Sequence, residues 1–216
     1  MTHSLRSWHW AALVANLGLA AIALNDAITH GLTGQYSLMS GLSGNPVAIM
    51  ISAVVHGLAY LGIVVVLWRE VDSFRQANRF ARGLRRILLA TFGFMALAML
   101  FVETWRPVGP AEAGGVAAVW ELIGSIAFGV MLLGSCLLGL ALLRNNPLGI
   151  GGRVLLGILP ALGLVILLDA VAPPWSHPGY VEFVQGVGMS LLGAGTAAAR
   201  RSSTLPASTG VPASGR

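Results

Sequence analysis

Long apolar segments, separated by short polar connections, account for most of this 216-residue chain. About 20 apolar residues form a helix long enough to cross the roughly 30 Å hydrocarbon core of a bilayer. Charged residues make up only 10% of the chain, against roughly 25% in a soluble domain, so lipid must cover most of the surface. The sequence therefore predicts an all-α fold, a polytopic transmembrane helical bundle over residues 1–201. Its six predicted spans lie at about 8–28, 47–68, 86–102, 117–143, 153–171 and 180–199.

The two ends of the chain carry different signals. Arg6 precedes the first apolar segment, an arrangement also typical of a secretory signal peptide. That segment is longer than a signal core, and removing it would leave an odd number of spans, so we expect a retained helix. Residues 202–216 are small, polar and rich in Pro and Gly, which predicts a disordered tail.

The basic residues predict the orientation of the bundle. All thirteen are arginine, and twelve of them fall at the termini or on the second and fourth connections, leaving only Arg106 on the opposite side. Cytoplasmic connections retain positive charge, so both termini should be cytoplasmic, in the inner (plasma) membrane of a bacterium. Because the arginines sit at the ends of apolar segments, we do not expect nucleic acid as a partner, despite a net charge of +5.

The connection between the second and third segments, residues 69–86, is rich in arginine. It is typical of a short basic amphipathic helix that lies on the membrane, with Phe74 and Phe80 at the acyl boundary and the cations on anionic headgroups. The alternative is a solvated connection that only sets topology. The candidate headgroup-binding residues are Arg75, Arg79, Arg82, Arg85 and Arg86.

Small residues recur at four-residue spacing along the last segment, at Gly186, Ser190, Ala194 and Ala198. Such stripes let helix backbones approach closely in lipid. They predict tight packing either within the bundle or between the subunits of a homo-oligomer.

The acidic residues gather at the predicted outer ends of the helices, in contrast to the arginines. Ionisable groups inside a membrane are costly, so each one needs a structural or functional reason. The first interpretation is structural, with a neutral His56 hydrogen-bonded to another helix. The second is a polar, acidic outer vestibule that binds a cation, a proton or a headgroup. Its candidate residues are His56, Glu121, Asp169, Glu182 and Glu103.

A third interpretation is a metal site in the outer half, with zinc as the candidate cofactor. Asp26 and His30 are four residues apart, so they would share one helix face. Zinc sites usually show closer ligand spacing, such as HxxxH or HExxH, and neither pattern occurs here. The candidate ligands are His30, His56, His177, Asp26 and Asp169.

Three stretches resemble the DUF998 family of bacterial multi-pass membrane proteins. They are SLMSGLSGNPVAIMISAVVHGLAYLGIVVVL (37–67), FVETWRPVGP (101–110) and PGYVEFVQGVGMSLLGAG (178–195). The resemblance implies a distant link to membrane hydrolases that carry a histidine/aspartate metal site, with Glu103 where the family tends to place an acid. The family also has a histidine early in the fourth span, where this chain has Trp120 and Glu121, and that departure argues against hydrolase activity.

Three functions follow as hypotheses. The first is a non-enzymatic integral membrane protein: a small transporter, a channel-like subunit or an accessory membrane subunit. The second is a membrane-embedded, metal-dependent lipid hydrolase with a His/Asp site in its outer half. The third is a membrane scaffold or assembly factor.

Overall fold

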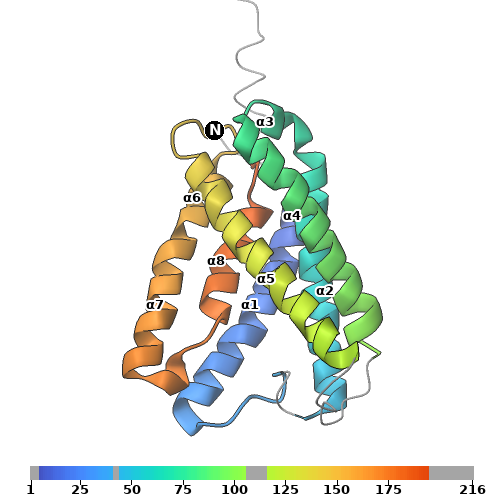
Figure 1. The fold of residues 1–216 in the computed structure, drawn as a ribbon, viewed down its shortest axis with the longest axis vertical. Coiled ribbons are helices and arrows are strands. Elements are labelled where there is room, and N and C mark those ends of the chain that lie inside the picture. Colours follow the sequence, from blue (N-terminus) through green and yellow to red (C-terminus); the bar gives the residue numbers. More distant parts are fainter. Residues whose placement is uncertain (1–4, 41–43, 106–115, 195–216) are drawn as a thin grey trace, which may run out of the picture.

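The computed structural model describes residues 5–40, 44–105 and 116–194, and all the regular structure in these ranges is helical (Figure 1). The predicted tail, residues 202–216, lies outside them. The long helices are α1 (Ser7–Thr33), α2 (Pro46–Arg69), α4 (Arg79–Ala98), α5 (Val116–Ala141), α7 (Ile158–Val171) and α8 (Gly179–Ser190). The short elements are α3 (Val71–Arg75), η1 (Met99–Glu103), α6 (Ile150–Val154), η2 (Leu155–Gly157) and η3 (Pro173–Trp175).

Five helical stretches in the described part of the chain are long and apolar enough to cross a membrane. They coincide with the first five predicted segments, so the expectation of a membrane-embedded helical protein is supported. The five stretches are Ser7–Thr33, Pro46–Arg69, Arg79–Glu103, Val119–Ala141 and Ile150–Val171.

The last helix is shorter than predicted. Helix α8 has 12 residues and ends at Ser190, a rise of about 18 Å that is less than the thickness of the hydrocarbon core. Residues 191–194 form a turn in which Gly193 has φ +79°. The prediction of one unbroken helix over 180–199 is therefore wrong within the described residues, and residues 195–199 lie outside them.

The fifth membrane-spanning stretch is interrupted near its start. Helix α6 passes into the 3-10 turn η2 before α7 begins at Ile158. Pro160 explains the tightening, because proline has no N–H to donate and its ring clashes with the carbonyl four residues earlier. Helix α7 lies on the opposite flank of the bundle from α2 and α4 and packs against α8 (Figure 1).

The basic connection over 69–86 is not one amphipathic helix. It consists of α3 followed by the first turns of α4, because the Asn78 side chain accepts the Ala81 N–H at 2.8 Å and caps α4 there. Phe74 is 1% exposed, so it belongs to the core and does not rest on the acyl boundary. Phe80 is exposed, as predicted.

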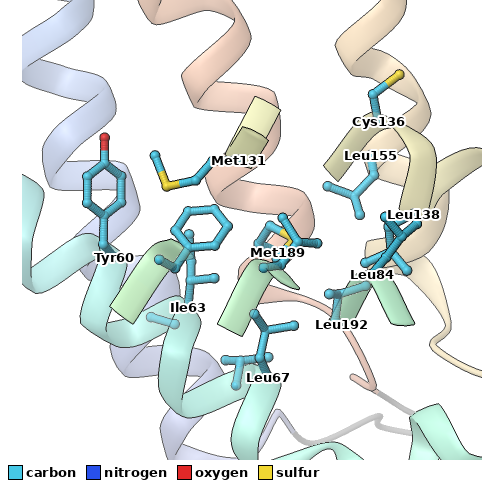
Figure 2. Close-up of a cluster of buried hydrophobic side chains, with 14 of the residues drawn as sticks. Tyr60, Ile63, Leu67, Leu84, Met131, Cys136, Leu138, Leu155, Met189 and Leu192 are labelled. Atoms are coloured by element: carbon cyan, nitrogen blue, oxygen red, sulfur yellow. The ribbon is translucent and has the colours of Figure 1, made fainter. Parts of the chain in front are cut away.

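The core lies where α2, α4, α5 and α8 meet. Figure 2 shows its side chains converging from these helices, with Ile63, Leu67, Leu84, Met131 and Met189 among them. All five are buried. This packing places α8 in the interior of the bundle despite its short length.

Two buried amides fasten α8 to its neighbours. Asn16 of α1 donates to the Ala59 carbonyl of α2 at 3.3 Å and to the Ser190 hydroxyl of α8 at 3.2 Å. Gln185 of α8 donates to the Ser135 hydroxyl of α5 at 2.9 Å. In a hydrocarbon environment polar groups must find such partners inside the protein, so these bonds specify which helices meet.

The close approach of α8 to α1 depends on Gly186, the first member of the predicted small-residue stripe. A Cβ there would lie 2.5 Å from the Asn16 side-chain oxygen, whereas a Cβ on Gly18 of α1 would meet nothing within 4 Å. This part of the stripe therefore packs within the bundle. Ala198, its last predicted member, lies outside the described residues.

We expect Gly186→Ala to lower the free energy of unfolding by about 1–3 kcal/mol, because the added methyl overpacks the Asn16 contact. Gly18→Ala is the matched control and should be neutral or slightly stabilising, since alanine favours a helix over glycine. Thermal unfolding in detergent measures both. Equal melting temperatures for the two variants would contradict the close α1–α8 approach.

Candidate functional site

Asp26 and His177 form a buried polar pair at the end of α1 remote from the N-terminus. Asp26 is 7% exposed, and its Oδ1 accepts the Ser37 backbone N–H at 2.8 Å. Its Oδ2 lies 3.3 Å from Nε2 of His177. The pair joins α1, the segment that follows it and the segment before α8.

The two ring nitrogens of His177 have different partners. The Gly179 N–H donates to Nδ1 at 3.0 Å, which leaves Nε2 as the donor to Asp26. Gly179 in turn packs directly against Ala23 of α1. With both ring nitrogens engaged within the protein, the pair holds the start of α8 against α1.

His30 has a separate role from His177. Its Nδ1 donates to the Pro174 carbonyl at 2.8 Å, and its ring stacks on Tyr36 with 4.8 Å between centroids. The next residue, Gly31, lies directly against the Trp175 ring. His30 therefore fastens η3 to the end of α1.

His56 bonds within its own helix. Its Nδ1 lies 2.8 Å from the Ser52 carbonyl, and its ring meets Tyr60 edge-on at 6.1 Å. The structural interpretation predicts a hydrogen bond from His56 to another helix, but among the described residues the structure gives His56 a partner only in its own helix.

The acidic vestibule candidates occupy different environments. Glu103 accepts the Trp120 indole N–H at 2.6 Å, which ties the end of the third membrane-spanning stretch to the start of α5. Glu121 and Asp169 are exposed, and Glu182 is half-buried. The vestibule stays a prediction.

The predicted metal ligands do not assemble. Of the five, only Asp26 and His177 make a direct contact. Within the described ranges, which include all five, no group of three His, Cys, Asp or Glu side chains is placed to hold a metal ion. Zinc sites use three or four protein ligands, so this donor set does not fit zinc.

The five arginines proposed to bind headgroups divide into two kinds. Arg75 pairs with Asp72 at 2.7 Å on the surface, and the half-buried Arg85 donates to the Leu67 carbonyl at 2.8 Å, so both have partners within the protein. The remaining three are exposed to solvent: Arg79, Arg82 and Arg86.

Glu70, at the junction of α2 and α3, is a buried carboxylate that the sequence did not single out. It is 2% exposed. Its Oε1 accepts from the Arg6 guanidinium at 3.1 Å and from the Trp8 indole at 3.3 Å, while Oε2 accepts the Ser73 hydroxyl at 2.9 Å. In the sequence it is one acid among many arginines, and no spacing distinguishes it.

The turn after α8 closes over the same carboxylate. His9 Nε2 donates to the Leu192 carbonyl at 3.0 Å and lies 3.6 Å from Glu70. Gly193 donates its N–H to the Leu148 carbonyl at 2.8 Å, and any side chain at Gly193 would collide with the Glu70 carboxylate. We call Arg6, Trp8, His9, Glu70 and Ser73 the Glu70 cluster. The turn after α8 packs against this cluster.

No family model, curated protein or solved structure matches this chain. The resemblance to the DUF998 family therefore remains a prediction.

We expect Glu70→Ala to lower the free energy of unfolding by roughly 1.5–3 kcal/mol, because the buried Ser73 and the half-buried Trp8 lose a charged acceptor. Asp72→Ala is the matched control, two residues away in an exposed pair, and should cost at most about 1 kcal/mol. Thermal unfolding in detergent measures the difference. Equal losses would show that the Glu70 cluster is not a structural anchor.

Proposed function

We propose that this chain is a six-span inner-membrane protein with both termini in the cytoplasm. In this proposal it acts as a non-enzymatic accessory subunit that contacts a partner in the bilayer through its α7 flank. The single observation that carries the proposal is that the membrane-spanning stretches are buried to very different extents inside the bundle. In Ile150–Val171 only 11% of the most apolar window is buried, against 28–39% in the other four stretches.

The polar side chains support a non-enzymatic role. Asn16 and Gln185 join helices to one another, and the Asp26–His177 pair holds the start of α8. Groups engaged in this way stabilise the bundle, because a polar group left unpaired in hydrocarbon is costly. Among the non-enzymatic roles, these hydrogen bonds favour an accessory subunit over a transporter, because a transporter would direct such polar groups toward its substrate pathway.

The α7 flank offers a surface for a partner helix. A groove of about 490 Å³ runs between α1, α7 and α8, and Ala20, Ala21 and Ala161 are among the side chains that line it. Small side chains of this kind allow a helix from another subunit to approach closely. On α7 itself, Ile166 and Val171 are more than half exposed.

The twelve-to-one arginine asymmetry supports the proposed orientation. Six spans also require the segment that begins with α8 to return the chain to the cytoplasmic side.

If the tail is cytoplasmic, the Ser208→Cys variant should react with a membrane-impermeant maleimide only after the membrane is permeabilised. Gln35→Cys, beyond α1, should react in intact cells. The buried Cys136 is replaced by Ser in both variants. Labelling of both positions in intact cells would contradict six spans.

Cross-linking tests the accessory role. We expect Ile166→Cys on α7, made in a Cys136→Ser background, to give one discrete adduct with a bifunctional maleimide in native membranes. Leu97→Cys on α4 is the matched control, since Leu97 is 60% exposed and Ile166 63%. Adducts of equal yield from both positions, or from neither, would refute a partner on the α7 flank.

A further inference from the structure

A second groove, of about 540 Å³, lies between α1 and α2 at the end that carries their arginines. Along α2 its wall is formed by Leu58, Leu61, Gly62 and Val65, which recur at helical spacing and end at Arg69. Along α1 it is lined by Ala11 and Ala15 and ends at Ser7 and Trp8. The groove is therefore apolar along its length and polar at one end only.

The cation at this end is available to a ligand. The guanidinium of Arg69 lies 5.7 Å from the centroid of the Trp8 ring, and Arg69 is exposed. The structure gives Arg69 no carboxylate partner within the described residues. The neighbouring Arg6 is engaged by Glu70 at 3.1 Å.

The length of the groove matches one leaflet. Leu58 and Arg69 are eleven residues apart, a rise of about 16 Å and about half of the roughly 30 Å hydrocarbon core. Helices α1 and α2 pack closely at the base of the groove, because a Cβ on Gly62 would lie 2.9 Å from the Ala12 Cα. An acyl chain lying in the groove would therefore bring its headgroup to Arg69.

We propose that this groove binds a phospholipid with a negatively charged headgroup. One acyl chain lies along Ala11, Ala15, Leu61 and Val65, and the headgroup phosphate pairs with Arg69. The charge of Arg69 selects an anionic headgroup, since basic sites between membrane helices favour anionic lipids. The Ser7 hydroxyl and the Trp8 indole lie at headgroup level, where indole rings are preferred. This site is distinct from the exposed arginines of α4 and does not depend on the proposed function.

Native mass spectrometry of the full chain in detergent tests the proposal, with phosphatidylglycerol and phosphatidylcholine titrated separately. We expect wild type to prefer phosphatidylglycerol about fivefold, the effect of one arginine near a lipid surface. Arg69→Gln should abolish that preference. Arg82→Gln, which changes an exposed side chain of α4, should retain it. Equal losses in the two variants would indicate a diffuse basic surface and overturn the proposal.

The acyl half of the site needs its own variant. Ala11 is exposed, so Ala11→Phe fills the groove without entering the core and should weaken both lipids, with phosphatidylglycerol affinity falling at least about fivefold. Ala170→Phe, at an exposed position on α7, is the matched control and should bind as wild type does. Wild-type binding by Ala11→Phe would overturn the proposal. Displacement of phosphatidylglycerol by an equal concentration of soluble glycerol phosphate would also overturn it, because the site would then recognise only an anion.

Discussion

Polar groups buried between membrane helices must be satisfied inside the protein, and in this chain that constraint centres on α8. Its start is held by the Asp26–His177 pair and its middle by Gln185. Its last turn is held by Asn16 through Ser190, and the turn beyond it closes over Glu70. Helix α8 is only 12 residues long, so these ties, together with core packing, keep it in the interior.

The two ends of the bundle use charge differently. At the arginine-rich end, Glu70 forms an ion pair with Arg6. Arg69 has no carboxylate partner among the described residues and lies at the mouth of an apolar groove. At the other end, Asp26 is engaged by a backbone N–H and an imidazole. Asp26 is thus satisfied within the protein, whereas Arg69 is exposed beside an apolar groove. That contrast is why we place the lipid site at the basic end.

The candidate site shows where sequence reasoning succeeded and where it failed. The sequence predicts Asp26 and His177 as two of five metal ligands, and the structure brings these two together as a hydrogen-bonded pair without the other three. The sequence groups His30 and His56 with them by residue type and predicted depth alone. Nothing in the spacing showed that His30 would bond Pro174, or that His56 would bond its own helix. Glu70 was missed because a single acid among arginines reads as a surface residue, and only folding buries it.

The sequence by itself indicated a lipid environment and a helical fold. Apolar runs of about 20 residues with few charges require helices in lipid, because no other open structure satisfies its backbone there. It also predicted the first five membrane-spanning stretches, which the structure supports. Only the tertiary structure decided where α8 ends, which polar groups meet and which arginine pairs with the buried Glu70. Those outcomes depend on contacts between residues far apart in the chain, such as Arg6 with Glu70 and Gly193 with Leu148, and local patterns do not encode them.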